Sequence, residues 1–363
     1  MQRLMKKMSK RAKWITGSII AVLAIVLIFV GIYTYRVYHS LDNLNKKPED
    51  SIFTNNSKEE VAPKWTGTER VNILLMGGDS RGMQKNEVPR SDSLIVASVD
   101  PVTKKGTLLS ILRDTYVDIP GHGKERINAA LAYGGPNLAM KTVSDLLGVP
   151  IQYYVYVDFK GFIALIDAID GIDFYVEKDM KYSSKADKHE YDIDLKKGMQ
   201  HLDGKSALQY VRFRHDAMSD FTRTERQREF LKAVASKMQT TWSIMKLPDI
   251  LEKVNPFIET NLNIDDMWKL AALGYDSQIG SSEQIPPMKL ISEDNAGGAA
   301  VIGIKNEQAL KDFVQETFTK DTAPPATPTD GTGTGTGSGT GTDQTKTDSN
   351  SSNQSNSTSS TSK

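Results

Sequence analysis

Three short apolar runs, at residues 71–76, 94–99 and 107–112, dominate the pattern in the first third of the chain. Each run has the length and the aliphatic, β-branched composition of a strand, and each adjoins a cluster of charged residues. Consecutive strands can pair antiparallel with one another. The pattern therefore predicts a three-stranded meander.

The connections of this meander bring three charged side chains to one edge of the sheet. Asp79 follows the first predicted strand, Asp92 precedes the second and Arg113 follows the third. For any one cluster alone, an unrelated surface loop is the simpler interpretation. Two carboxylates and a guanidinium at a shared edge, however, suit a metal ion and a phosphorylated ligand.

The pattern then alternates between helical and extended periods. A helix is predicted over residues 136–147, ended by Gly148 and Pro150, and a strand over 153–157. Asp158 has the position of an N-cap for a second helix that ends at Gly171. Extended structure resumes at residues 174–176.

The remaining pattern completes an α/β domain over residues 69–321. Residues 178–198 are charged and irregular, which indicates a surface loop or lid. A strand is predicted over 207–213 and a helix over 222–237, with further helices and strands over 241–318. Strands that alternate with helices, together with the meander, predict a single domain with a central mixed β-sheet flanked by helices.

The N-terminal segment has the pattern of a membrane anchor. Residues 1–13 are basic and residues 14–35 carry no charge, a length that spans a bilayer core as a helix. The basic flank predicts a single-pass protein with its N-terminus in the cytoplasm and its domain outside. A cleaved signal peptide is the alternative, but the apolar run is long and no small-x-small site follows it.

Two polar segments flank the domain. Residues 36–68 are predicted to form a stalk, and residues 322–363 are rich in Thr, Gly, Ser and Asn with almost no apolar side chain. The second segment cannot bury a core, so we expect a disordered tail.

Composition removes several classes of function. Lys plus Arg and Asp plus Glu both number 45, which argues against a protein that coats nucleic acid. There is no Cys, so disulfides and thiolate chemistry are excluded. The five His do not form a spacing such as H-E-x-x-H, which argues against a zinc hydrolase.

A second group of polar residues could complete the site. On the predicted strand, Arg212 and Arg214 would share one face. Thr222 and the acid three residues later fit a capping box that would start a helix at Arg223 and place Gln227 on the same face. A helix N-terminus favours an anion, and Arg adds paired hydrogen bonds to phosphate oxygens. The alternative is a solvated face on which the arginines pair with nearby acids, namely Asp216, Asp220, Glu225 and Glu229.

Five motifs, in order and with consistent spacing, resemble the LytR-CpsA-Psr family over residues 71–237. They are Gly77-Gly78-Asp79-Ser80-Arg81, Arg90-Ser91-Asp92-Ser93, Ser110-Ile111-Leu112-Arg113-Asp114-Thr115, Arg126-Ile127-Asn128-Ala129, and Arg212-Phe213-Arg214 followed by Arg223 and Gln227. One departure is visible. The family's usual Gly-Asp-x-Gly-Arg run reads Ser219-Asp220-Phe221-Thr222-Arg223 here, which makes this loop stiffer.

The resemblance implies an outward-facing membrane enzyme of Gram-positive bacteria. Such enzymes transfer an anionic glycopolymer, such as wall teichoic acid, from a polyprenyl diphosphate carrier to the C6 hydroxyl of N-acetylmuramic acid in peptidoglycan. By this resemblance, Asp79 and Asp92 match the carboxylates that hold Mg²⁺, and Arg113 matches the catalytic arginine on the diphosphate. The other matching diphosphate ligands are Arg90, Arg212, Arg214, Arg223 and Gln227.

Several alternatives stay open at this stage. The general base could be Asp79, Asp92 or Asp220. Water as the acceptor would make the protein a Mg-dependent polyprenyl diphosphate hydrolase, and binding without turnover would make it an envelope sensor or transcriptional attenuator. Candidates for a lipid groove lie on the two predicted helices, where core packing explains them equally well: Leu138, Val143, Leu146, Leu147, Phe162, Leu165, Ile166 and Ile169.

Overall fold

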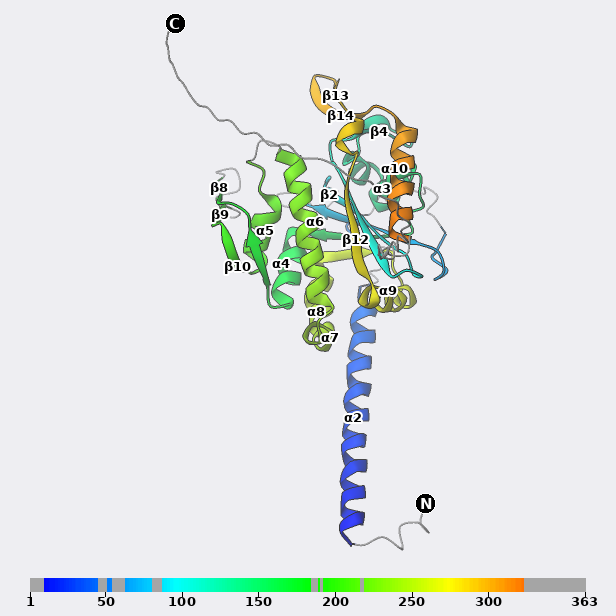
Figure 1. Ribbon diagram of the computed structural model, residues 1–363, viewed down its shortest axis with the longest axis vertical. Coiled ribbons are helices and arrows are strands. Elements are labelled where there is room, and N and C mark those ends of the chain that lie inside the picture. Colours follow the sequence, from blue (N-terminus) through cyan, green and yellow to red (C-terminus); the bar gives the residue numbers. More distant parts are fainter. Residues whose placement is uncertain are drawn as a thin grey trace, which may run out of the picture. The chain divides into compact units, whose positions relative to one another are not determined.

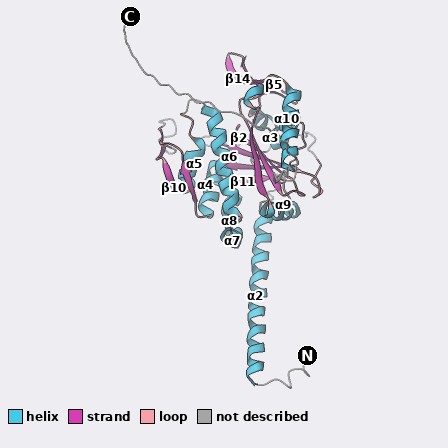
Figure 2. Ribbon diagram, in the orientation of Figure 1, coloured by secondary structure: helices cyan, strands magenta, loops and turns pink. Residues whose placement is uncertain are grey.

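A six-stranded mixed sheet forms the centre of the domain (Figures 1 and 2). The computed structural model describes residues 10–44, 51–53, 63–79, 87–183, 189, 192–215 and 219–322. The tail was predicted over residues 322–363; Thr322 ends helix α10 (Glu307–Thr322), and residues 323–363 lie outside the described residues. The strand order in the sheet is β11-β6-β1-β2-β3-β12. These strands are β1 (Val71–Gly78), β2 (Ser91–Val99), β3 (Lys105–Ile111), β6 (Tyr153–Asp158), β11 (Ile258–Thr260) and β12 (Gln278–Ile285).

The predicted meander is confirmed. β2 pairs antiparallel with both β1 and β3, while β6 runs parallel to β1 and β12 runs parallel to β3. β11 adds an antiparallel edge strand beside β6. The sheet is therefore mixed, as the pattern of meander followed by helices and strands predicted.

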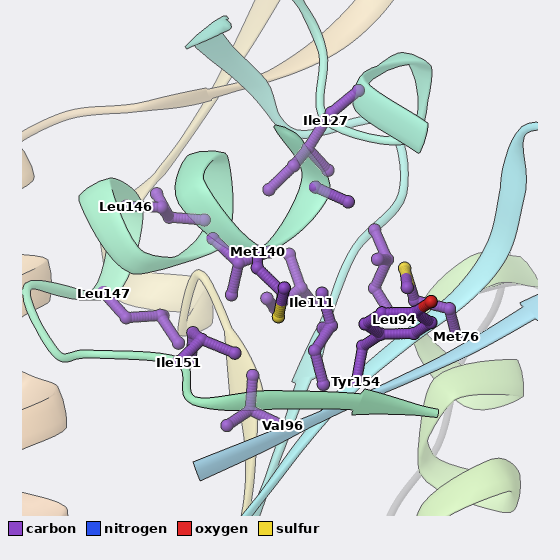
Figure 3. Close-up of a cluster of buried hydrophobic side chains, with 14 of the residues drawn as sticks. Met76, Leu94, Val96, Ile111, Ile127, Met140, Leu146, Leu147, Ile151 and Tyr154 are labelled. Atoms are coloured by element: carbon purple, nitrogen blue, oxygen red, sulfur yellow. The ribbon is translucent and has the colours of Figure 1, made fainter. Parts of the chain in front are cut away.

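Helices cover both faces of this sheet. α3 (Ala129–Leu147) and α10 (Glu307–Thr322) share a buried cluster with strands β1, β2 and β3. Figure 3 shows part of this cluster, in which Met140 of α3 lies near Ile111 of β3 and Leu147 lies beside Ile151. α6 (Ser219–Met238) contacts β3 and β12, on the other side of the sheet in Figure 1.

A second core lies beside the sheet. It is formed by α4 (Phe159–Ala168), β7 (Ile172–Val176), β10 (Gly198–Leu202), α5 (Gly204–Arg212) and one side of α6, with Phe230 at its centre. The remaining elements are β4 (Tyr116–Ile119), β5 (Gly123–Arg126), β8 (Met180–Tyr182), β9 (Ile193–Leu195), α7 (Thr241–Met245), α8 (Leu247–Val254), η2 (Asn255–Phe257), α9 (Ile264–Asp276), η3 (Met288–Leu290), β13 (Ile291–Ala296) and β14 (Ala299–Ile304).

The helix cap predicted at Asp158 and the helix end predicted at Gly148 are both present. The Asp158 carboxylate accepts a hydrogen bond from the Gly161 amide at 2.8 Å, so it caps α4. α3 begins seven residues before the predicted position, but Gly135 interrupts it with a φ of 67°, and a regular helix restarts at Pro136. Gly148 ends this helix with a φ of 69°.

One predicted strand is wrong. Residues 207–213 belong mainly to helix α5, in which Ala207, Leu208 and Val211 are buried. Their spacing of three and four residues is helical, and the Asp203 side chain caps the helix by accepting from the Ser206 amide at 2.8 Å. A window of seven residues was too short to distinguish the period of a helix, 3.6 residues, from that of a strand, two residues. Arg212 and Arg214 therefore do not share a strand face.

The predicted start of α6 is also wrong. The helix begins at Ser219 instead of Arg223, so Thr222 lies inside it and does not cap it. Asp220 occupies the first turn, where a carboxylate is favoured by the helix dipole. The capping-box pattern at Thr222 was a coincidental match.

Residues 178–198, predicted as an irregular loop or lid, contain regular structure where they are described. β8 and β9 pair antiparallel, and β10 begins at Gly198. Met180, Ile193 and Leu195 are buried in the second core. These short strands therefore belong to the folded domain.

The apolar N-terminal segment is part of helix α2 (Lys10–Asp42). Within it, residues 18–42 form a helix long and apolar enough to cross a membrane by length and composition. The helix continues into the segment predicted as a stalk, and Val37, Leu41 and Leu44 are buried beside Tyr153. In its described parts, this segment is packed on the domain. Residues 37, 41 and 44 are three and four positions apart and so form one apolar stripe at the end of the helix. The stalk prediction considered only the polar content of the segment and therefore missed this stripe.

Candidate active site

Strands β1, β2 and β3 place the three predicted charged residues at one rim of the sheet. Gly78 pairs with Ser91 across a β-bulge, and Leu94 pairs with Ile111. The end of β1, the start of β2 and the end of β3 are thus neighbours. Arg113 Nη1 lies 2.5 Å from Asp92 Oδ1, which joins two of the three side chains directly. We call Asp79, Asp92 and Arg113 the meander half of the site.

Tyr156 lies beneath this rim. Its side chain is 1% exposed, and a Cβ on Gly78 would stand 2.6 Å from its hydroxyl oxygen. Burial raises the pKa of Tyr156, and the nearby charges of Asp158, Glu259, Asp79 and Asp92 raise it further. The hydroxyl is therefore neutral, and it has no hydrogen-bond partner among the described residues. Gly78 is needed here because any larger residue would meet this phenol ring.

Helix α6 supplies the second half of the site from the other face of the sheet. Arg223 Nη2 donates to the Asp92 backbone carbonyl at 3.3 Å. One turn later, Gln227 Oε1 accepts from Ser93 Oγ at 3.0 Å. The two α6 residues that were predicted to share a face thus both contact the start of β2.

Asp220 connects the arginines of this second half. Its Oδ1 lies 2.7 Å from Arg214 Nη2 and 2.7 Å from Arg223 Nη2. The predicted alternative, pairing of arginines with nearby acids, is therefore present at Asp220. One carboxylate does not satisfy two guanidiniums, and the Nε groups of Arg214 and Arg223 are buried without a partner among the described residues. We call Arg214, Arg223 and Gln227 the helix half of the site.

The charge balance at Arg223 favours an anionic ligand. The side chain is 6% exposed, and burial lowers the pKa of Arg223 to about 10. Asp220 and Asp92 oppose this decrease, whereas the positive charges of Arg214 and Arg113 add to it. At neutral pH the guanidinium is still charged, so the fold holds a buried cation next to two others. An anion bound between them would relieve this cost.

The other predicted arginines occupy the margins of this arrangement. Arg90 is exposed and directly precedes β2. Arg212 ends α5, and its guanidinium lies 4.9 Å from the centre of the Phe159 ring.

Sequence reasoning missed three contributors to the site. Tyr156 looked like an ordinary strand residue. Asp114, 3.6 Å from both Arg113 Nε and Arg126 Nε, extends the charged network of the meander half. Arg226 is buried, donates to the Phe213 carbonyl at 2.8 Å and pairs with Glu177 at 2.7 Å, so it supports the chain that carries Arg214. Asp114 directly follows Arg113, and Arg226 lies between Arg223 and Gln227. Their positions within these two motifs were the sequence signal that could have identified them.

A model of the LytR_cpsA_psr family matches residues 34–316. The chain belongs to this family. The matched range starts within α2 and includes both halves of the site. The resemblance drawn from five motifs is therefore confirmed.

Two relatives and one solved structure describe this family membership further. The chain is 35% identical over 274 residues to the polyisoprenyl-teichoic acid–peptidoglycan teichoic acid transferase TagU of Bacillus anthracis. This alignment covers 75% of this chain and 85% of the relative. The chain is also 36% identical over 256 residues to the regulatory protein MsrR of Staphylococcus aureus, in an alignment that covers 68% of this chain and 75% of the relative. A LytR-CPS2A-psr family protein, YwtF (TagT), solved with bound octaprenyl pyrophosphate lipid, matches with a TM-score of 0.54 and 26% identity over 74% of this chain and 97% of that one.

Proposed function

We propose that this family member is a membrane-anchored phosphotransferase that moves an anionic glycopolymer, such as wall teichoic acid, from a polyprenyl diphosphate carrier to the C6 hydroxyl of N-acetylmuramic acid in peptidoglycan. The observation that carries the proposal is the group of three arginines, Arg113, Arg214 and Arg223, around a rim with two carboxylates. A diphosphate has the charge and the oxygen geometry that three guanidiniums recognise. The relative solved with octaprenyl pyrophosphate and the relative named as a teichoic acid transferase support this choice of ligand and reaction.

The reaction is a phosphoryl transfer, in which the protein mainly positions groups and compensates charge. The acceptor hydroxyl oxygen forms a bond to the phosphorus that carries the glycopolymer. The bond from this phosphorus to the bridging oxygen breaks, polyprenyl monophosphate leaves, and the hydroxyl proton passes to a base. Arg113 faces the rim from the end of β3 and would stabilise charge on the transferring phosphoryl group. Arg214 and Arg223 would hold the leaving phosphate.

Mg²⁺ is the cofactor that these carboxylates suit. Among the described residues, no three His, Cys, Asp or Glu side chains converge on one point, so a metal cage made by protein alone is not formed there. Mg²⁺ usually takes one or two carboxylates and completes its shell with water and phosphate oxygens. Asp79 and Asp92 would hold the ion, which would neutralise charge on the diphosphate when bound. Asp92 would then exchange its contact with Arg113 for the metal.

Asp220 is better suited to positioning than to proton transfer. Its Oδ1 lies 2.7 Å from both Arg214 Nη2 and Arg223 Nη2, so this oxygen is already engaged by two guanidiniums. We assign it the task of holding the two guanidiniums beside each other.

The test is a transfer assay with full-length protein in detergent or vesicles. The donor is a polyprenyl diphosphate-linked sugar, and peptidoglycan fragments are present or absent, with and without Mg²⁺. We expect a covalent glycan–peptidoglycan product that requires the acceptor and Mg²⁺ and disappears in Asp79→Asn. Polyprenyl monophosphate released at the same rate without acceptor would instead identify a hydrolase. Binding of the donor that is independent of Mg²⁺ and followed by no product would identify a sensor, a role consistent with the name of the regulatory relative.

A further inference from the structure

Helix α7 carries an exposed apolar surface next to the anchor helix. Trp242, Ile244 and Met245 are 53%, 36% and 59% exposed, although each is large and apolar. We call these three residues the α7 patch. Single exposed apolar residues are common on soluble domains, but three on one turn of helix indicate a contact surface.

The α7 patch adjoins the membrane-spanning part of α2. Ile244 and Met245 line one apolar hollow together with Phe29, Val30 and Tyr33. The Tyr33 hydroxyl donates to the Ile244 carbonyl. All three α2 residues lie inside the uncharged run of residues 14–35, so the patch is level with the outer end of the predicted span.

The next contact along α2 marks where the polar region begins. Arg36 is the first charged residue after the uncharged run, and its Nη2 lies 2.7 Å from Asp249 of α8. Phe29 and Arg36 are seven residues apart, which is about 10 Å along a helix at 1.5 Å per residue. A depth of about 5–10 Å is where amphipathic elements insert at the boundary of headgroups and acyl chains.

The polar edges of the patch also fit a membrane interface. Trp242 Nε1 donates to Asp170 Oδ2 at 2.8 Å, so its one polar atom is satisfied by the domain while much of its ring is exposed. Lys246 Nζ lies 4.3 Å from the centre of the Trp242 ring and 2.9 Å from Asp170. Tryptophan with lysine beside it is the combination found where a protein meets lipid headgroups.

We propose that the α7 patch inserts into the outer interfacial layer of the bilayer that α2 spans, as a second lipid contact of the domain. The proposal rests on the membrane anchoring in the proposed function. Because α2 and α7 contact each other at this level, a bilayer around residues 14–35 would meet the patch without any rearrangement. The second contact would fix the tilt of the domain on the membrane, which a single helix leaves variable.

The absence of cysteine allows a direct test. Full-length Met245→Cys, labelled with an environment-sensitive fluorophore, is reconstituted into phosphatidylglycerol-containing vesicles with or without lipids that carry a quenching doxyl group. We expect a blue-shifted, severalfold brighter emission than from a label on a water-exposed surface of the domain, and strong quenching by shallow doxyl lipids. Ala299→Cys on β14 is the control, because Ala299 is exposed and β14 lies at the opposite end of the domain from α7 in Figure 1, so its label should stay unquenched.

A third label separates this proposal from the anchoring itself. Val26→Cys should be quenched by deep doxyl lipids if α2 spans the bilayer. Quenching at Val26 without quenching at Met245 would overturn the α7 contact and leave the anchor in place, whereas no quenching at either would overturn both. A Met245 signal that appears only above one protein per vesicle would show that a second copy covers the patch, and this would also overturn the proposal.

Discussion

In the meander half of the site, Asp79, Asp92 and Arg113 take their positions from backbone pairing of adjacent strands, whereas the helix half depends on contacts between side chains. β2 pairs antiparallel with both β1 and β3, so the end of β1, the start of β2 and the end of β3 meet at one rim. Arg214 and Arg223 are separated by nine positions and meet through Asp220, and Gln227 reaches β2 through Ser93. The first half is therefore set by local pairing, and the second by the docking of α6 on the sheet.

The difference has an energetic consequence. Arg113 is partly exposed and paired with Asp92, so the fold pays little for it. Arg223 is buried, with a pKa lowered to about 10, and the fold holds it charged against that cost. Residues that a fold maintains at a cost to stability are commonly ones that a ligand needs. A mutation of Arg113 should therefore reduce activity with little change in stability, whereas a mutation of Arg223 should change both activity and stability.

The largest effect is expected in the meander half. Arg113→Ala should reduce glycopolymer transfer by about 100-fold or more, because a donor to developing charge is lost. The melting temperature should change little, since the lost ion pair is partly exposed. Transfer rates and thermal unfolding measure the two effects. Lys124→Ala removes an exposed positive charge on β5 and serves as the control. A folded Arg113→Ala protein with normal transfer would contradict the assignment.

In the helix half, Arg223→Met should weaken transfer and raise stability together. Folding lowers the pKa of this arginine, so the protonated group opposes folding at every pH below about 10, and an apolar residue of similar length removes this cost. Thermal unfolding at neutral pH should show a higher melting temperature than for the original protein.

Arg226→Met is the matched control for this experiment. Arg226 is equally buried, but it donates to the buried Phe213 carbonyl and pairs with the half-exposed Glu177, so its loss leaves the Phe213 carbonyl unpaired and breaks an ion pair. We expect a lower melting temperature for this variant. If Arg223→Met destabilised the protein as much as Arg226→Met, the distinction between a site arginine and a structural arginine would fail.

Gly78→Ala tests how tightly the rim is built. The added methyl carbon would stand 2.6 Å from the Tyr156 hydroxyl, so the end of β1 must shift and carry Asp79 with it. A displacement of about 1 Å costs on the order of 100-fold in rate when it misplaces a reacting group. Gly274→Ala on α9 is the control, because a Cβ there meets nothing within 4 Å. Equal transfer rates in both variants would show that the rim tolerates movement.

The smallest effect is a thermal shift with inorganic diphosphate. A ligand that binds only the folded state at 100 times its dissociation constant stabilises it by about 2.7 kcal/mol, or several degrees. We expect such a shift for the original protein, enhanced by Mg²⁺, and a much smaller one for Arg223→Met. A shift of the same size in Arg223→Met would remove the helix half from the binding site.

The sequence by itself determined the family, the mixed α/β class, the apolar helix and the position of Asp79, Asp92 and Arg113 at one rim of the sheet. These features depend on short-range information: the length of each apolar run and the residues that directly flank it. The cap at Asp158 and the helix end at Gly148 are equally local, and both are present.

Only the tertiary structure decided how the helix half is built. Residues 207–213 have a short apolar pattern that fits either period, and burial against α4 and α6 selects the helix. For the same reason Arg212 and Arg214 cannot be placed by strand alternation, and the link through Asp220 follows from the early start of α6. Tyr156 reaches the rim because β6 runs parallel to β1. Contacts between residues far apart in sequence have no periodic signature, so packing alone fixes them.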